Sequence, residues 1–294
     1  METSEDGDGD SAATLTKAFI ILLVLIPVSC YKKPFKESWE HHFSQQAKQE
    51  TKATPPIAEK AKSKKKKLYL TFDDGPNKGT KNVLTIVKDE KVPVSFFIVG
   101  EHVFASVAQQ QMWDSLKMAE QIELCNHSYC HANGRYEKYY GLPDSVVKDF
   151  ERTHDSLDLD NRIARTPGRN IWRIDTLQFT DLKKTKAAAD SLEKAGFALM
   201  GWDLEWHFDH KTMSVATTAE KMIAQIDSAF QKNKTKSPDH LVMLAHDQAY
   251  VKSNDSMELR IFLQMLKQRD DYEFLLVTDY PGADKKIPDS LKTK

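Results

Sequence analysis

The stretch Thr71-Phe72-Asp73-Asp74-Gly75-Pro76 decides the fold that this sequence predicts. It follows the apolar run 68–70, which is typical of a strand, and its Gly-Pro pair predicts a turn. Two adjacent carboxylates therefore stand at the carboxyl end of a strand, where (β/α) barrels carry their active sites. Because neighbouring side chains on a strand point to opposite faces, we expect one carboxylate to face a bound ion and the other a substrate. Taken alone, these residue types are more often only a polar turn.

A second polar motif, His127-Ser128-Tyr129-Cys130-His131, follows the apolar run 122–125. Histidines four residues apart lie on one face of a helical turn, so we expect both imidazoles to reach one ion. Together with one aspartate they would make a three-ligand site that leaves a position for water. A lone histidine pair at this spacing is weak evidence for a metal, and the combination with the paired aspartates gives it weight.

The two motifs together resemble those of the polysaccharide deacetylases, the NodB homology domain of carbohydrate esterase family 4. That family carries T-F-D-D-G-P and then H-[ST]-x-x-H, and both stand unaltered at residues 71–76 and 127–131. The resemblance covers about residues 67–280. It implies a distorted (β/α) barrel with about seven parallel strands.

The pattern along the chain agrees with an α/β fold. Strand-like apolar runs alternate with helix-like patterns from residue 67 onward, and such alternation predicts a parallel sheet. The alternation alone does not separate a doubly wound sheet from a barrel. The polar motifs fall at the ends of several non-adjacent strands, an arrangement that favours a barrel mouth.

The resemblance implies a role for each residue of the first two motifs. Asp73 would be the general base, and Asp74, His127 and His131 would be the metal ligands. Aspartate and histidine suit Zn²⁺, which is the first choice of ion, and Co²⁺, Ni²⁺ and Mn²⁺ stay open.

Two later motifs supply further candidates by the same resemblance. His246, preceded by Leu244 in an L-x-H-D motif, matches the histidine that acts as catalytic acid. Arg165 matches the arginine that orients the base and keeps it ionised, because a neighbouring positive charge favours a carboxylate. In the same R-x-P-Y motif Pro167 is retained, whereas Gly168 replaces the tyrosine. Glycine keeps the backbone N–H that the family uses for the oxyanion, but the aromatic wall is lost. Arg169 and Trp172 are candidates to replace that wall.

The family's D-x-x-D-W motif is altered, because the chain reads Gly201-Trp202-Asp203-Leu204-Glu205-Trp206 here. Trp206 matches the tryptophan of the acetyl pocket. Either Glu205 or Asp203 would orient the acid histidine, and the sequence leaves that choice open. Two cysteines near the histidine motif, Cys125 and Cys130, are interpreted as buried small apolar residues, and a disulfide between them also stays open.

The N-terminal part predicts export from the cytoplasm. Residues 18–29 form an apolar run that is short for a membrane-spanning helix and fits a signal-peptide core. Ser29 before Cys30 resembles a bacterial lipoprotein cleavage site, and an uncleaved anchor or a secreted form is the alternative. We therefore expect a leader or membrane anchor at 1–30, a flexible polar linker at 31–66, the catalytic domain at 67–280 and a short tail at 281–294.

The predicted function is metal-dependent removal of N-acetyl groups from an extracytoplasmic polysaccharide, with release of acetate. Peptidoglycan, chitin-like oligomers and poly-N-acetylglucosamine are all compatible substrates. The alternatives are an O-acetyl esterase acting on xylan-type glycans, a non-catalytic glycan-binding barrel and an amidohydrolase for small cyclic amides. The net charge of −1 gives no support to nucleic-acid binding.

Overall fold

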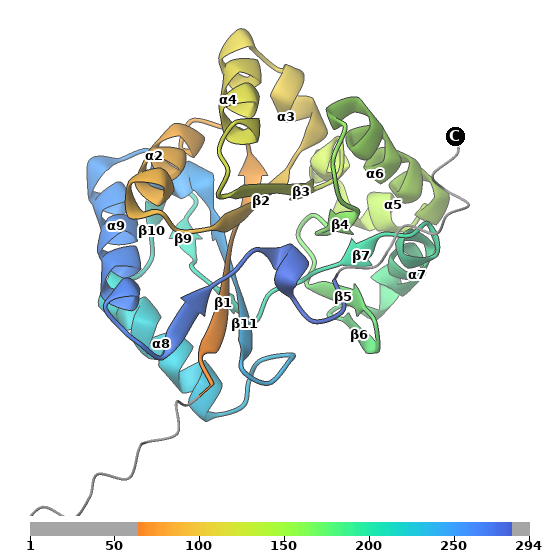
Figure 1. The fold of residues 1–294 in the computed structure, drawn as a ribbon. Helices are drawn as coiled ribbons and strands as arrows, with labels where there is room; N and C mark the ends of the chain where they lie inside the picture. The colour runs from red at the N-terminus through yellow and green to blue at the C-terminus, as the bar shows by residue number, and fades with distance from the viewer. Residues whose placement is uncertain (1–63, 284–294) are drawn as a thin grey trace, which may run out of the picture. The chain divides into compact units, whose positions relative to one another are not determined.

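A curled, mostly parallel sheet organises the chain (Figure 1). The computed structural model describes residues 64–283. The strands follow the order β6-β5-β7-β4-β3-β2-β1-β11-β8, with β12 beside β1, and this path curls without closing between its two ends. The strand bounds are β1 Lys66–Gly75, β2 Val94–Ile98, β3 Ile122–Asn126, β4 Ile163–Ala164, β5 Ile171–Ile174, β6 Leu177–Thr180, β7 Ala198–Leu199, β8 Leu204–Glu205, β11 His240–His246 and β12 Tyr272–Phe274. The expected distorted (β/α) barrel is confirmed.

Strand β1 is the centre of this sheet. Its apolar side chains are buried on both faces, which explains why the run reads as continuously hydrophobic. One edge pairs with β11 along its length, and the other edge pairs first with β12 and then with β2. The β1–β11 register places Asp73 opposite His246 at the carboxyl ends of both strands.

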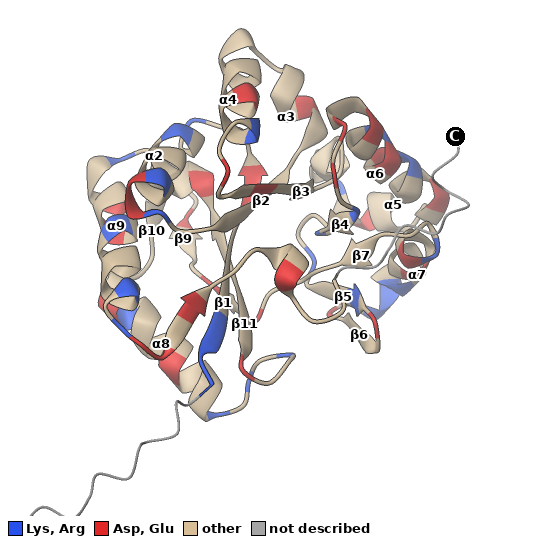
Figure 2. Cartoon of the chain, in the orientation of Figure 1, with Lys and Arg blue, Asp and Glu red and all other residues tan. Residues whose placement is uncertain are grey.

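Helices cover the outside of the curled sheet (Figure 1). Helices α2, α8 and α9 pack on one part of it through the largest apolar cluster, and α6 and α7 pack on another part through a smaller cluster. A third cluster fills the interior of the barrel. Figure 2 shows charges of both signs interspersed along the outer helices, as expected for solvated helix faces. The helix bounds are α2 Thr80–Glu90, α3 Gly100–Phe104, α4 Val107–Lys117, α5 Tyr136–Tyr140, α6 Pro143–Leu157, α7 Lys186–Lys194, α8 Ala219–Gln231 and α9 Ser253–Lys267, with short 3₁₀ turns at His131–Gly134, Lys183–Thr185, Asp247–Tyr250 and Val277–Asp279.

Two antiparallel additions depart from the simple alternation. Strands β5 and β6 form a hairpin at one end of the sheet, and β9 (Phe208–Asp209) and β10 (Ser214–Val215) form a separate two-stranded ribbon. The ribbon follows β8 and brings residues 208–210 toward the carboxyl ends of the central strands. These additions therefore contribute to the region where the polar motifs gather.

The predicted leader, most of the linker and most of the tail lie outside the described residues. Within residues 64–283, no helix has the length and apolar character needed to span a membrane.

Candidate active site

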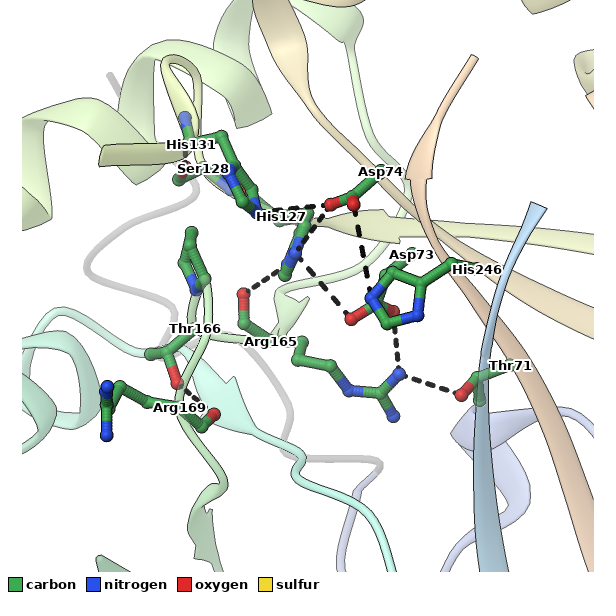
Figure 3. Close-up of polar contacts among 12 residues, drawn as sticks. Thr71, Asp73, Asp74, His127, Ser128, His131, Arg165, Thr166, Arg169 and His246 are labelled. Atoms are coloured by element: carbon green, nitrogen blue, oxygen red, sulfur yellow. Dashed lines mark hydrogen bonds and ion pairs between the residues drawn. The ribbon is translucent and has the colours of Figure 1, made fainter. Parts of the chain in front are cut away.

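The paired aspartates both face one pocket, at a bulge that ends β1 (Figure 3). The β1–β2 register shifts between Asp73 and Gly75, and Asp74 has a positive φ of 71°. This bulge turns the second carboxylate back to the side of the first, because an extra residue in one strand re-aims its side chain. The expectation that the two carboxylates face opposite ways is therefore wrong. His102 supports the bulge, since its Nδ1 lies 2.8 Å from the Asp74 carbonyl oxygen.

The two motif histidines meet through a tight loop, and the expected helical turn is wrong. His127 directly follows β3, while Ser128 and His131 have positive φ values of 67° and 46°. The Ser128 hydroxyl accepts a hydrogen bond from the His131 backbone N–H at 3.0 Å, which closes the loop. The imidazole of His127 is buried, and its Nδ1 donates to the Arg165 carbonyl oxygen at 2.8 Å. That bond leaves Nε2 as the nitrogen that faces the pocket.

Three ligand atoms converge on one point (Figure 3). Asp74 Oδ1 lies 3.4 Å from His127 Nε2 and 3.1 Å from His131 Nε2, yet this buried oxygen has no hydrogen bond. Burial alone would raise the pKa of the Asp74 carboxyl, but the two imidazoles hold it well below its usual value. An ionised oxygen beside two imidazole nitrogens is a donor set that suits a divalent cation. The residues present therefore fit the expected metal.

Asp73 is held by Arg165 in a buried ion pair. Arg165 Nη1 donates to Asp73 Oδ1 at 2.7 Å and to the hydroxyl of Thr71 at 2.7 Å. The remaining donors of this guanidinium reach the carbonyl oxygens of Met200 and Gly201, and its carbon lies 4.0 Å from the centre of the Phe97 ring. Because the arginine binds only Oδ1 of Asp73, the second oxygen, Oδ2, is left to face the pocket. That oxygen lies 3.6 Å from His127 Nε2.

His246 lines the same pocket, but neither expected carboxylate orients it. Its Nε2 lies 4.0 Å from Asp74 Oδ2, and its buried Nδ1 has no hydrogen bond. Asp203 accepts backbone N–H groups from Lys236 and Val242 at 2.7 and 2.8 Å, so this carboxylate fastens a loop at the opposite end of β11. Glu205 does line the pocket, and its Oε1 lies 3.2 Å from His207 Nδ1. The assignment of Asp203 to His246 is thus contradicted, and the hydrogen bond expected from Glu205 is not formed in this structure.

The tryptophan assigned to the pocket is also the wrong one. Trp206 is 1% exposed in the outer core, where it packs on Tyr250 and Phe262 and its Nε1 donates to the Thr217 carbonyl oxygen. Strand β8 has only two residues, and Trp206 follows the face of Leu204 toward the helices. Trp202, which precedes the strand, lines the pocket instead.

Of the remaining residues expected to contact the substrate, only some lie in the pocket. Gly168 and Leu244 line it, whereas buried Pro167 contributes its carbonyl oxygen to the Tyr140 hydroxyl at 2.6 Å. Within the described part of the chain, the Gly168 backbone N–H has no hydrogen-bond partner, so it can donate to a ligand. Neither proposed replacement for the missing wall lines the pocket, because Trp172 is fully buried and Arg169 pairs with Asp181.

Gln248 and Tyr136 line this pocket and were not expected from the sequence, whereas Phe208 and His210 belong to a stretch that the sequence indicates as a polar loop beside the site. Gln248 Nε2 lies 3.4 Å from Asp74 Oδ2, and Phe208 packs on the His246 ring with centroids 5.2 Å apart. His210 and Tyr136 complete the lining. Gln248 stands two residues after the histidine of the L-x-H-D motif, a position that could have indicated it, but no pattern pointed to Tyr136. The two nearby cysteines, Cys125 and Cys130, are free thiols.

The comparisons with known proteins agree with this geometry. Residues 60–169 match the family model described as polysaccharide deacetylase. The matched segment, which is similar to that family, contains Asp73, Asp74, His127, His131 and Arg165. A CE4 esterase from Streptococcus mutans has the same fold as this chain, with a TM-score of 0.54 and 24% identity over 72% of this chain and 86% of that chain.

Two curated relatives show how far the family likeness extends. The chitooligosaccharide deacetylase of Bradyrhizobium sp. (strain ANU 289) is 39% identical over 144 residues, which cover 47% of this chain and 56% of that protein. The peptidoglycan-N-acetylglucosamine deacetylase of Bacillus cereus is 25% identical over 209 residues, which cover 69% of this chain and 67% of that protein. The match to this chain thus spans little more than half the length of the first relative.

Proposed function

We propose that this chain is a metal-dependent hydrolase that removes N-acetyl groups from an extracytoplasmic polysaccharide and releases acetate. The observation that carries the proposal is the convergence of Asp74, His127 and His131 beside an aspartate that Arg165 holds in place. The two curated relatives named above act, by their names, on N-acetylglucosamine polymers. Peptidoglycan, a chitin-like oligomer or poly-N-acetylglucosamine would suit such a site.

The residues around the metal site divide the chemistry between them. A divalent cation bound there would polarise the acetyl carbonyl and lower the pKa of a water molecule. Asp73 and His246 both line the pocket. The free oxygen of Asp73 would take a proton from the attacking water, and His246 would protonate the leaving nitrogen. The Gly168 N–H would stabilise negative charge that develops on the carbonyl oxygen.

Acetate release tests this proposal. The zinc-loaded chain would be incubated with N-acetylglucosamine oligomers, peptidoglycan and acetylated xylan, beside chelated protein and the variant Asp73→Asn. We expect release from an amide substrate, its abolition by chelation, and a loss of about 10²- to 10⁴-fold on removal of the base. Asp114→Asn is the control, because this carboxylate on α4 is 60% exposed and pairs only with Lys117.

The results of this acetate-release assay distinguish the candidate functions. Release from xylan alone would assign an O-acetyl esterase. No release from any substrate by the metal-loaded chain would contradict the proposal and favour a non-catalytic glycan-binding barrel.

We also propose that the N-terminus carries the enzyme across the membrane and anchors it there through Cys30, as the sequence pattern indicates. Mass spectrometry of the membrane fraction would show an acylated Cys30 as the first residue of the mature chain. Full-length chain in the cytoplasmic fraction would contradict this part of the proposal.

A further inference from the structure

Tyr136, the first residue of α5, stands between two hollows in the surface. One is the candidate active site, with a volume of about 280 Å³. The other is an adjoining cavity of about 440 Å³, which Arg169 and Lys184 also line. The same ring lines both, so it forms the partition between them.

The ring of Tyr136 is fixed on its active-site side. It meets the imidazole of the ligand His131 edge to face, with ring centroids 6.0 Å apart and an interplanar angle of 83°. Such perpendicular contacts are a preferred arrangement of aromatic rings. Tyr136 is half-buried, and burial together with the charge of Asp74 raises the pKa of its hydroxyl.

The ring also occupies the space beside Gly168. A Cβ atom added at residue 168 would lie 3.1 Å from Tyr136 Cε1 and 3.3 Å from Cζ, and this glycine has a positive φ of 62°. A side chain at 168 would therefore compete with Tyr136 for the same volume. The aromatic wall that the sequence lacks at residue 168 is present in the structure, but it comes from a different segment.

This placement suits the recognition of a sugar. The face of an aromatic ring packs against apolar C–H groups, and the unpaired N–H of Gly168 stands beside it as a hydrogen-bond donor. A pyranose that carries an N-acetyl group presents both an apolar ring face and a carbonyl oxygen. The site thus offers a complementary group for each.

We propose that Tyr136 is a specificity-determining residue of this site, which packs against the acetylated sugar ring and closes the site off from the adjoining cavity. The inference rests on the proposed function. It assigns the substrate contact to the aromatic ring of Tyr136 and not to its hydroxyl.

Steady-state kinetics on a chitin-like N-acetylglucosamine pentamer test this role. Tyr136→Ala should raise KM about tenfold and change kcat by less than about threefold, because the wall contributes to binding rather than to proton transfer. Tyr136→Phe should restore KM to within about twofold of the wild type. Phe179→Ala is the matched control, since this aromatic side chain on β6 is 37% exposed and lines neither hollow.

A double-mutant cycle tests the contact with residue 168. Gly168→Ala should raise KM in the wild type, because the added methyl group displaces the tyrosine ring. The same change should have a smaller effect on KM in the Tyr136→Ala background, where the ring is gone. Bound zinc per chain, measured in each variant, separates this role from simple support of His131, because a loss of metal would indicate support.

The outcomes distinguish this inference from the proposed function. An unchanged KM in Tyr136→Ala, loss of zinc in that variant, or equal effects of Gly168→Ala in both backgrounds would overturn the role of Tyr136 while the deacetylase activity stands. A wild-type chain that releases no acetate from any glycan would overturn the proposed function, and this inference with it.

Discussion

Arg165 is the residue that holds Asp73, the proposed base, most directly. It is fully buried, and its partner Asp73 has a side chain only 4% exposed. A buried carboxylate that loses its cation is left with an uncompensated charge, which typically costs about 3–5 kcal/mol. The arginine also orients His127 through its carbonyl oxygen, so backbone shifts there would reach the proposed metal ligands.

We therefore expect Arg165→Ala to lower the free energy of unfolding by about 3–5 kcal/mol and to abolish acetate release. Urea unfolding followed by circular dichroism measures the first effect. Arg260→Ala is the matched control, because this arginine is 29% exposed and its pairs with Asp89 and Glu90 are worth about 1 kcal/mol at most. Equal losses in the two variants would contradict the account of the buried pair.

The two tryptophans around β8 should respond differently to truncation. Trp206→Ala removes a fully buried side chain and should cost about 3–5 kcal/mol of stability. Trp202→Ala removes a pocket residue and should mainly raise KM. Thermal unfolding and kinetics on the same preparations distinguish them. A raised KM with unchanged stability in Trp206→Ala would restore the assignment made from the sequence.

Single residues show where sequence reasoning reaches its limit. The intact motifs located Asp73, Asp74, His127, His131 and His246, and the partly retained R-x-P-Y motif located Arg165. The structure brings all of them to one place. The altered D-x-x-D-W motif gave the wrong pocket tryptophan. Strand β8 decides which side chain faces inward, and its two residues are too few to show an alternation of apolar and polar side chains. Tyr136 escaped detection because its position depends on a loop with several positive φ values.

At the scale of elements, Asp247 joins the end of β11 to the start of α2. It is fully buried and accepts hydrogen bonds from Asn77 and Thr80, in the turn that follows the paired aspartates. Burial raises the pKa of its carboxyl to about 7. The folded chain therefore binds the proton of the Asp247 carboxyl more tightly than the unfolded chain does. The stability that this proton contributes is lost as the pH rises from about 4 to about 7.

Asp247→Asn should remove this pH dependence. As the pH rises from about 4 to about 7, the unfolding free energy of the wild type should fall relative to that of the variant by about 1 kcal/mol per pH unit. Chemical unfolding at several pH values from 4 to 8 measures it. A difference that stays constant, or that moves in favour of the wild type as the pH rises, would contradict the inferred pKa. Asp175→Asn, at an exposed turn residue, is the control.

Element boundaries followed the sequence only where local signals agreed with tertiary contacts. The sequence indicates Thr80 as the cap of helix α2, but Thr80 is the first residue of the helix and Gly79 is its N-cap. The spacing of Thr217 and Glu220 in the sequence indicates a capping box. It does not form, because Thr218 is the N-cap and its side chain makes no capping bond. Glu258 of α9 accepts the Ala219 N–H instead, at 2.7 Å. A partner from a distant helix cannot be read from local spacing.

At the scale of the whole molecule, the parallel α/β sheet was predictable and its edges were not. The long buried strands β1 and β11 have clear hydrophobic runs that end in polar motifs, which is why the barrel and its mouth followed from the sequence. Strands β4, β7 and β8 have only two residues each, so the pairing partners rather than local propensity define them. The β5–β6 hairpin was missed for a related reason, since a four-residue strand gives little periodicity.

We propose that the two adjacent carboxylates have different roles, Asp74 as a metal ligand and Asp73 as the base. Zinc bound per chain, determined by elemental analysis after equilibration and desalting, tests it most directly when it is measured for the wild type, Asp74→Asn and Asp73→Asn. We predict one zinc per chain in the wild type and loss of that zinc in Asp74→Asn. The Asp73→Asn variant should still bind one zinc per chain but release no acetate. A wild type without zinc, or an Asp74→Asn variant that retains it, would contradict the account.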